Sequence, residues 1–200
     1  MEFQAWPKTP RLNRQMVVTE KLDGTNAAVV IAPAEGFAAS DPDVIEIMEV
    51  AGVDHVVCAQ SRKRFVTPQS DNFGFARWVS ENAPGLVEAL GPGTHFGEWW
   101  GQGIQRGYGL KEKRFSLFNT NRWEYNDPRH EGVPGLGTVP VLFTGLFDSS
   151  IINDIVTYDL EESYAAPGFN NPEGVVVWHD AARQSFKVLK ENDDIPKGNE

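Results

Sequence analysis

The sequence is poor in cysteine and in long apolar runs. Cys58 is the single cysteine among 200 residues, which excludes an internal disulfide and a cysteine-based metal cluster. It lies in the apolar stretch DHVVCAQ, so we expect a small core residue. No apolar run approaches the length of about 20 residues that a membrane-spanning helix needs, and the N-terminus lacks the basic-then-apolar form of a signal peptide. We therefore expect an intracellular, cytoplasmic protein without membrane association.

Positive charge is also scarce. Lys and Arg number 18 against 28 Asp and Glu, which gives a net charge of -10 at pH 7. This balance argues against a protein that coats nucleic acid through bulk positive charge. The basic residues gather in SRKR (61–64) and KEKR (111–114). Clusters of this kind are usually solvated loops, and these two matter to function only if they flank the same site.

The overall composition is that of an ordinary globular protein. Hydrophobic residues make up 40% of the chain and charged residues 23%, so a packed core is expected. The length fits one domain. We expect a single domain over residues 1–200, with no appended oligonucleotide-binding (OB) fold or C-terminal domain, and a polar tail (191–200) that frays.

Apolar spacing predicts two helices and a larger number of strands. The run 70–90 is the clearest helix, with Ser70 or Asp71 available as its cap and residues recurring at helical spacing until Pro84, and the run 149–165 reads as a second helix. The segments expected to form strands are 16–20, 27–32, parts of 41–64, 93–101, 113–123, 173–179 and 184–190. The predicted class is α+β, with mostly antiparallel sheets packed against helices.

The stretch TEKLDGTN (19–26) has two interpretations. Asp23-Gly24 between two strand-like runs is a strong signal for a β-hairpin turn. Alternatively, Lys21 is a nucleophile held at a strand end where its amine can attack phosphorus. These eight residues alone favour the turn, because Asp-Gly turns are common.

Four further charged residues allow both a structural and a functional interpretation. Arg62 is either a surface charge or a fork for phosphate oxygens. Glu98 lies between aromatics in HFGEWWG, where an unpaired carboxylate is costly, so we expect it to have an arginine, a hydroxyl or a metal-bound water as partner. Glu173 is the first residue of EGVVV. It is either a charge that keeps a strand edge soluble or a residue of the functional site. Lys187 in SFKVLK is on the face that strands most often turn to solvent.

The order of these residues is more specific than any one of them. Lysine-x-Asp-Gly, arginine, Gly-Glu, an aromatic strand, Glu-Gly and lysine follow one another as in the covalent nucleotidyltransferases, the ligase and capping-enzyme superfamily, which the chain resembles over 19–190. EKLDGTN resembles the RNA-ligase branch, where an asparagine, here Asn26, stands two residues after the glycine. FGEWWG, RFSLFN, EGVVVWH and SFKVLK resemble the later motifs. The resemblance implies a nucleotidyltransferase (ATP-grasp-like ligase) core of the phage-type, nick-sealing RNA ligases.

The chemistry of that family explains the residue types. A lysine attacks the α-phosphorus of ATP to give lysyl-AMP, AMP passes to a 5′-phosphate RNA end, and a 3′-hydroxyl displaces it to join the strands. A free lysine, with a pKa of about 10.4, is protonated at neutral pH, so burial or a nearby cation must disfavour its charged form. The resemblance makes Lys21 the nucleophile and gives Glu173 to a Mg²⁺ or Mn²⁺ ion.

The resemblance also implies the remaining roles. Glu98 would hold the ribose hydroxyls, Arg62 and the catalytic Lys187 would contact phosphate, and Phe118 would stack on adenine, with Phe115 as the alternative. The other motif residues assigned to the nucleotide are Glu20, Asp23, Gly24, Asn26 and Lys190.

Two positions depart from the family pattern. The last motif usually carries two lysines one residue apart, but Leu189 occupies the second place. Lys190 is the available substitute, although it should point to the opposite face from Leu189. Asn119 follows the aromatic strand where relatives more often have aspartate. Both departures concern the phosphate and metal contacts and leave the lysine chemistry intact.

Two other functions remain open at this point. One is a minimal DNA ligase, although we expect no OB-fold of the kind that DNA ligases append after the last motif. The other is a module that binds nucleotides or RNA ends and no longer ligates. The expected partners are RNA ends or a nicked RNA duplex, as in RNA repair, and the oligomeric state is not predicted.

Overall fold

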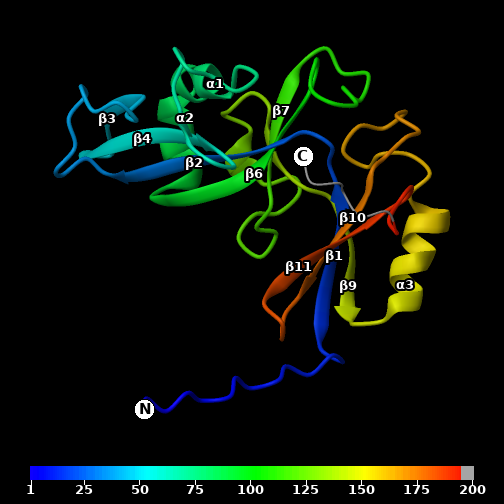
Figure 1. The fold of residues 1–200 in the computed structure, drawn as a ribbon. Coiled ribbons are helices and arrows are strands. Elements are labelled where there is room, and N and C mark those ends of the chain that lie inside the picture. The colour runs from blue at the N-terminus through cyan, green and yellow to red at the C-terminus, as the bar shows by residue number, and fades with distance from the viewer. Residues whose placement is uncertain (195–200) are drawn as a thin grey trace. The chain divides into compact units, whose positions relative to one another are not determined.

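A computed structural model describes residues 1–194, and the last part of the tail expected to fray (195–200) lies outside the described residues. The fold is α+β with mostly antiparallel sheets, as predicted (Figure 1). The strands are β1 (Gln15–Lys21), β2 (Thr25–Pro33), β3 (Glu46–Val50), β4 (Val53–Ser61), β5 (Phe65–Val66), β6 (Gly93–Gly101), β7 (Lys113–Leu117), β8 (Leu136–Thr138), β9 (Val141–Leu146), β10 (Gly174–His179) and β11 (Gln184–Leu189). The helices are α1 (Phe75–Glu81), α2 (Ala83–Leu90), α3 (Ser149–Asp154), the short 3-10 helix η1 (Pro128–His130) and the π-helix η2 (Ile155–Asp159). Within residues 1–194, no helix is long and apolar enough to cross a membrane.

The chain forms two compact units. One, here called the split unit, combines Met1–Lys21 with the described residues from Pro140 onward. The other, the continuous unit, is Leu22–Val139. Each has its own sheet and its own core. The expectation of a single domain stays a prediction.

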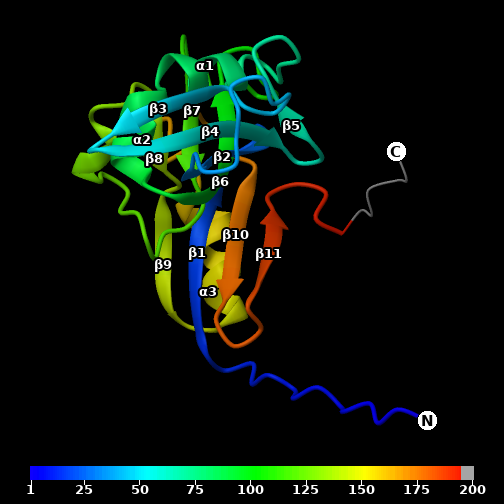
Figure 2. The same cartoon turned by 90° about the vertical axis from the view of Figure 1, so that its left-hand side faces the viewer.

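The split unit is an antiparallel sheet with a helix on one face. Its strand order is β11-β10-β1-β9, and α3 lies along this sheet in both views (Figures 1 and 2). Alternate residues of β1 and β10 point to α3, because a strand turns successive side chains to opposite faces. The residues buried in this core are Met16, Val18, Ile152, Ile155, Val156, Leu160, Val175 and Val177.

The second helix is shorter than the sequence predicts. Asp148 caps α3 by accepting a hydrogen bond from the Ser150 N–H at 2.8 Å, and regular helical structure ends with η2 at Asp159. Beyond it, the Ser163 N–H donates to the Phe169 carbonyl at 2.8 Å, and the Ala165 N–H donates to a side chain of β1 at 2.9 Å. These backbone donors are used in turns and tertiary contacts, so the expected helix does not continue to residue 165.

The continuous unit is a larger sheet with α1 and α2 on one face. Its strand order is β3-β4-β2-β6-β7-β8, β5 pairs with β4, and β8 runs parallel to β7. Both helices lie on the same side of this sheet in Figures 1 and 2. The aromatic centre of the core is formed by Phe75, Trp78, Trp99 and Phe115, whose ring centroids lie 5.1–5.8 Å apart.

The run predicted as one helix over 70–90 is two helices. Asn82 separates α1 from α2, and Pro84 lies in the first turn of α2, where the missing N–H costs nothing. Asp71 has the capping role, since its carboxylate accepts from the Ala76 N–H at 2.8 Å and the Arg77 N–H at 3.1 Å. The proline that reads as a stop therefore also starts the next helix.

The hairpin interpretation of Asp23-Gly24 is wrong. β1 pairs with β9 and β10, whereas β2 pairs with β4 and β6. The two strands that flank the Asp-Gly dipeptide belong to different sheets and do not pair with each other. The nucleophile interpretation of Lys21 remains.

Candidate functional site

Lys21 and Glu173 form an ion pair in the split unit. The Lys21 ammonium donates to Glu173 Oε2, and the two side chains are 23% and 15% exposed. Gly174, opposite Lys21 in the register of β1 and β10, has a φ of +149°, and a Cβ there would lie 2.2 Å from the Val188 carbonyl oxygen. Only glycine fits at this position, so the Glu-Gly dipeptide lets Glu173 lie beside Lys21 while β11 passes close by.

Lys187 lies on the same face of this sheet as Lys21. In the register, Thr19 pairs with Val176 and Val176 pairs with Lys187, so these side chains share the face away from α3. Leu189 lies across Gly174 from Lys21 on that face. An apolar side chain thus occupies the place of the second lysine of the family motif.

Lys190 points the other way. Its ammonium donates to the Leu160 carbonyl, in the core on the α3 side of the sheet, and its N–H donates to the Glu173 carbonyl at 3.0 Å. Lys190 therefore supports the backbone at Glu173 but does not join Lys21 and Lys187 on their face.

Glu20 is also turned toward the α3 side. It is only 1% exposed, and its Oε2 accepts from the Ala165 N–H at 2.9 Å. Burial raises the pKa of the Glu20 carboxyl above its ordinary value, and hydrogen bonds from Ser163, Ala165 and Tyr164 oppose that shift. Glu20, for which a nucleotide-binding role was expected, is thus a buried carboxyl on the face of the split-unit sheet opposite to Lys21.

In the continuous unit, several of the other expected residues share the sheet face that the helices leave uncovered. Asn26 of β2 pairs with Glu98 of β6, and Glu98 pairs with Ser116 of β7. The alternate residues Trp99 and Phe115 face the helical core. Asn26 and Glu98 are therefore neighbours on one polar row across the sheet.

Two exposed phenylalanines continue that face. The Phe118 N–H donates to the Phe96 carbonyl at 3.0 Å, which extends the pairing of Gly97 with Leu117 by one residue. Phe96 is 48% exposed and Phe118 is 40% exposed. Phe115, the alternative for stacking on adenine, is fully buried among the core aromatics, so Phe118 is the residue accessible to a ligand.

The basic clusters are partly used within the protein. The Arg64 guanidinium turns back to Ser70, donating to its carbonyl and its hydroxyl at 3.1 Å each. Lys113 donates to the Phe73 carbonyl at 2.7 Å. Arg62 and Lys63 are exposed on the turn after β4. Because Ser61 pairs with Ala27, this turn begins at the end of the row that contains Asn26.

The Asp23-Gly24 turn is fixed by a loop that sequence reasoning missed. The Asp23 N–H donates to Tyr108 Oη at 2.7 Å, and the Asp23 carboxylate accepts from Arg106 Nε at 3.0 Å. A Cβ on Gly24 would lie 2.4 Å from the Trp99 carbonyl oxygen, so the turn lies directly on β6. Arg106 and Tyr108 thus hold the segment that follows Lys21 in the chain.

The loop itself (101–110) is anchored by a buried aromatic residue. Tyr108 is 3% exposed and packs edge-on against Trp100, with ring centroids 4.8 Å apart. The loop glycines Gly101, Gly103, Gly107 and Gly109 all have positive φ. The signal that could have identified the loop is the glycine-rich run GQGIQRGYGL directly after the Gly-Glu motif.

Comparison with known proteins supports the resemblance found in the motifs. The sequence matches the model of the RNA ligase family over residues 14–190. No curated protein sequence matches the chain.

Among solved structures, a ligand-free mutant of Naegleria gruberi RNA ligase matches with a TM-score of 0.53 at 16% identity, covering 92% of this chain and 51% of that one. A second mutant of the same ligase, with ATP and Mn, matches with a TM-score of 0.52 at 17% identity, covering 91% and 53%. The chain thus spans about half the length of these relatives, and at such identity the likeness shows the fold. Because the family model covers most of the sequence, the chain belongs to the RNA ligase family.

Proposed function

We propose that the chain is an ATP-dependent RNA ligase that forms a lysyl-AMP intermediate on Lys21 and joins 5′-phosphate to 3′-hydroxyl RNA ends. The observation that carries this proposal is the pairing of Lys21 with Glu173, on the sheet face that also contains Lys187. A lysine, a carboxylate and a second cation are the groups that nucleotidyl transfer to an amine requires.

The first step is attack of Lys21 Nζ on the α-phosphorus of ATP. A nitrogen–phosphorus bond forms, the bond to the bridging oxygen breaks, and pyrophosphate leaves with the bonding electrons. Nζ must lose a proton for this attack, and the ion pair with Glu173 Oε2 by itself favours the ammonium. A cation held by Glu173 would weaken that pair and so favour the neutral amine. Lys187 contributes positive charge for the phosphate oxygens, where negative charge is dispersed in the transition state.

A divalent cation fits the donor set at Glu173. No residue among 1–194 donates a hydrogen bond to Glu173 Oε1, so this oxygen is available to a hard cation. Described residues contain no group of three or more His, Cys, Asp or Glu side chains that could hold a metal, which suits Mg²⁺ or Mn²⁺ held by one carboxylate, waters and substrate phosphates. Such an ion supplies positive charge beside the phosphates when bound. Naegleria gruberi RNA ligase structures with ATP and Mn, and with AMP and Mn, support this choice.

The adenosine contacts are assigned to the continuous unit. Glu98 accepts hydrogen bonds from the ribose hydroxyls, Asn26 lies next to it, and Phe118 stacks on the adenine ring. Arg62 contacts phosphate. A half-buried carboxylate and an exposed ring on one sheet face suit a ribose and a base, since the first needs hydrogen-bond acceptors and the second a flat apolar surface.

The substrate is RNA on the 3′-hydroxyl side of the junction. Asn26 stands where DNA ligases usually have arginine, and a 2′-hydroxyl, or the sugar shape that it imposes, is what distinguishes RNA from DNA at one position. A nicked duplex whose last 3′-side nucleotides are changed from ribose to deoxyribose tests this point. Sealing should fall sharply while formation of lysyl-AMP is unchanged, and equal sealing of both substrates would make the chain a DNA ligase.

Covalent labelling tests the core of the proposal. Incubation with α-labelled ATP and Mg²⁺, followed by a denaturing gel, should label the wild-type chain and the control Lys8→Ala, whose lysine is exposed near the N-terminus. Lys21→Ala should not label. Covalent label on Lys21→Ala that survives the denaturing gel would overturn the assignment, and an unlabelled wild-type chain would favour a binding module.

A further inference from the structure

The uncovered face of the continuous unit contains a second exposed aromatic ring that the proposed chemistry does not use. Phe96 is 48% exposed and lies two residues before Glu98 on the same strand, so both side chains point to the same face. Its cross-strand neighbour is Phe118, to which the adenine is assigned. An exposed phenylalanine in the middle of a sheet costs solubility and contributes little to the core.

The surroundings of Phe96 are those of a base-binding surface. Across the sheet, Phe96 pairs with Ala28, and Ala28 pairs with Gln60. Ala28 is fully buried, whereas Phe96 beside it is 48% exposed. Gln60 offers both donors and acceptors for a base edge. Aromatic rings on neighbouring strands of an open sheet are a recurrent way in which proteins stack unpaired RNA bases.

Positive charge for a phosphate lies at the end of the same face. Arg62 and Lys63 follow Gln60 on the turn after β4, about 12 Å from Phe96 by strand spacing and rise. In a chain of net charge -10, this exposed basic turn is a local exception that suits a nucleic-acid backbone. A ring, an amide and a basic turn therefore follow one another across a single sheet face.

We propose that Phe96 is a stacking platform for one unpaired base of the RNA substrate, beside the adenine on Phe118. This inference rests on the proposed function, because it assumes that RNA is the substrate. Phe118 and Phe96 each offer one exposed ring and so each hold one base. The two rings divide the face between nucleotide and RNA, with Lys63 of the basic turn holding an RNA phosphate.

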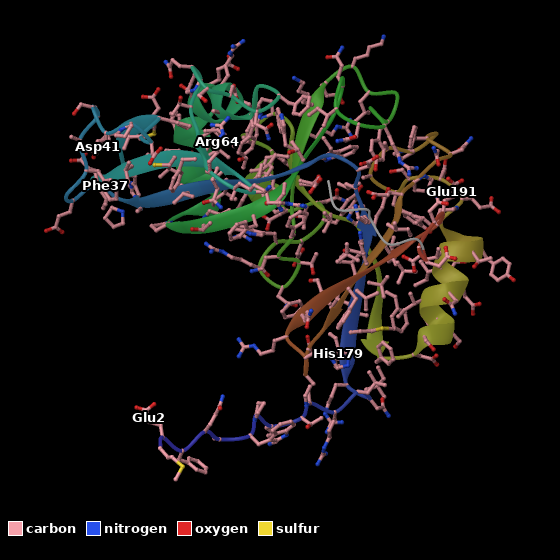
Figure 3. The ribbon with its side chains drawn as sticks, in the orientation of Figure 1. Glu2, Phe37, Asp41, Arg64, His179 and Glu191 are labelled. Carbon is pink, nitrogen blue, oxygen red and sulfur yellow. The ribbon has the colours of Figure 1, made fainter. Side chains whose placement is uncertain are left out.

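The test compares Phe96→Ala with Phe96→Tyr and with Phe37→Ala. Phe37 is matched to Phe96, since it is also 48% exposed and belongs to the same unit, but it lies in the segment between β2 and β3 (Figure 3). The probe is a 5′-phosphorylated single-stranded oligoribonucleotide, with filter binding as the readout. Loss of one base–ring stack should weaken binding by about 5- to 100-fold in Phe96→Ala, whereas Phe96→Tyr and Phe37→Ala should bind like wild type.

Abasic substitutions in the oligoribonucleotide sharpen the result. Removing the base at one position near the end should weaken binding to the wild-type chain and have no further effect on Phe96→Ala, because the same contact is then lost from both sides. Equal binding by Phe96→Ala and wild type would overturn the proposal. So would a higher ATP requirement for labelling with unchanged RNA binding, which would assign Phe96 to the nucleotide. Formation of lysyl-AMP from labelled ATP by the wild-type chain tests the proposed function separately from RNA binding.

Discussion

The two units hold their candidate functional residues in different ways. In the split unit, Lys21 and Lys187 lie on strands of one sheet, and Glu173 directly precedes β10, so strand register brings the three residues to one face. In the continuous unit, the turn at Asp23 is held by side chains of Arg106 and Tyr108 from a loop far along the chain. The first arrangement depends on backbone pairing and the second on side-chain contacts, so substitutions should affect them differently.

The largest effect should follow from Glu173→Gln in the split unit. The amide keeps the shape of the side chain but removes the charge that pairs with Lys21 and that a hard cation needs. AMP labelling should fall by more than about 100-fold. Loss of a residue that only hydrogen-bonds to a metal ligand costs up to about 100-fold, and Glu173 is proposed to contact the metal itself. Thermal unfolding should change little, because the strand end tolerates the swap. Full labelling in Mg²⁺ would make Glu173 a structural residue.

Gly174→Ala tests whether backbone register creates the pairing of Lys21 with Glu173. The added Cβ would lie 2.2 Å from the Val188 carbonyl oxygen at a φ of +149°, so β10 and β11 must move apart. We expect a loss of about 2–4 kcal/mol in the free energy of unfolding, together with weaker labelling. Gly132→Ala is the control, since a Cβ there meets nothing within 4 Å. Equal stability of the two variants would contradict the role of close strand packing.

Arg106→Ala tests the side-chain arrangement of the continuous unit. It removes the partner of the Asp23 carboxylate and should lower the rate of AMP labelling by about 10-fold, with a stability loss below about 1 kcal/mol because the pair is partly exposed. The fall should appear in kcat rather than in KM for ATP, and Arg106→Lys should recover part of it. Arg77→Ala, whose side chain is exposed, serves as control. A change confined to KM would assign Arg106 to direct nucleotide binding.

The smallest effect should be a pH dependence of stability with opposite signs in the two units. Burial lowers the pKa of His95 and His130 in the continuous unit and raises the pKa of Glu20 in the split unit. Stability from the two histidines is complete above about pH 6.5, their unfolded value, and is lost as the pH falls below it, because the unfolded chain then binds more protons.

The Glu20 contribution runs the other way. It is complete below the ordinary carboxyl value of about 4.3 and is lost as the pH rises through the raised folded pKa. In urea unfolding measured between pH 4 and 8, the free energy of unfolding should therefore depend less on pH below about 6.5 in His130→Gln, and less on pH above about 4.3 in Glu20→Gln. Identical pH profiles for wild type and both variants would contradict the two assignments.

The sequence was most informative where function depends on strands. Alternation in EGVVVWH and QSFKVLK predicted β10 and β11, and the face shared by Lys21 and Lys187 follows from their register. The buried position of Cys58 was also predicted from its apolar neighbours and is confirmed. These features depend on residues close in sequence or on simple periodicity.

Contacts between distant parts of the chain could not be predicted. Arg106 is 83 residues from Asp23 and Tyr108 is 85 residues away, and no local pattern links them. The division of 70–90 into two helices depends on how Asn82 and Pro84 pack. Asp23-Gly24 has the local sequence of a hairpin turn, and only the strand pairing shows that its two flanking strands belong to different sheets. In each case tertiary contacts override a correct local preference.

The lone thiol has a practical consequence. Cys58 is 7% exposed, and burial raises its pKa, so a maleimide reagent at neutral pH should leave it unmodified. Phe37→Cys and Ser185→Cys, on exposed residues of the two units, would then accept a donor and an acceptor fluorophore on a silent background. Energy transfer between them would report in real time whether ATP changes the distance between the two units.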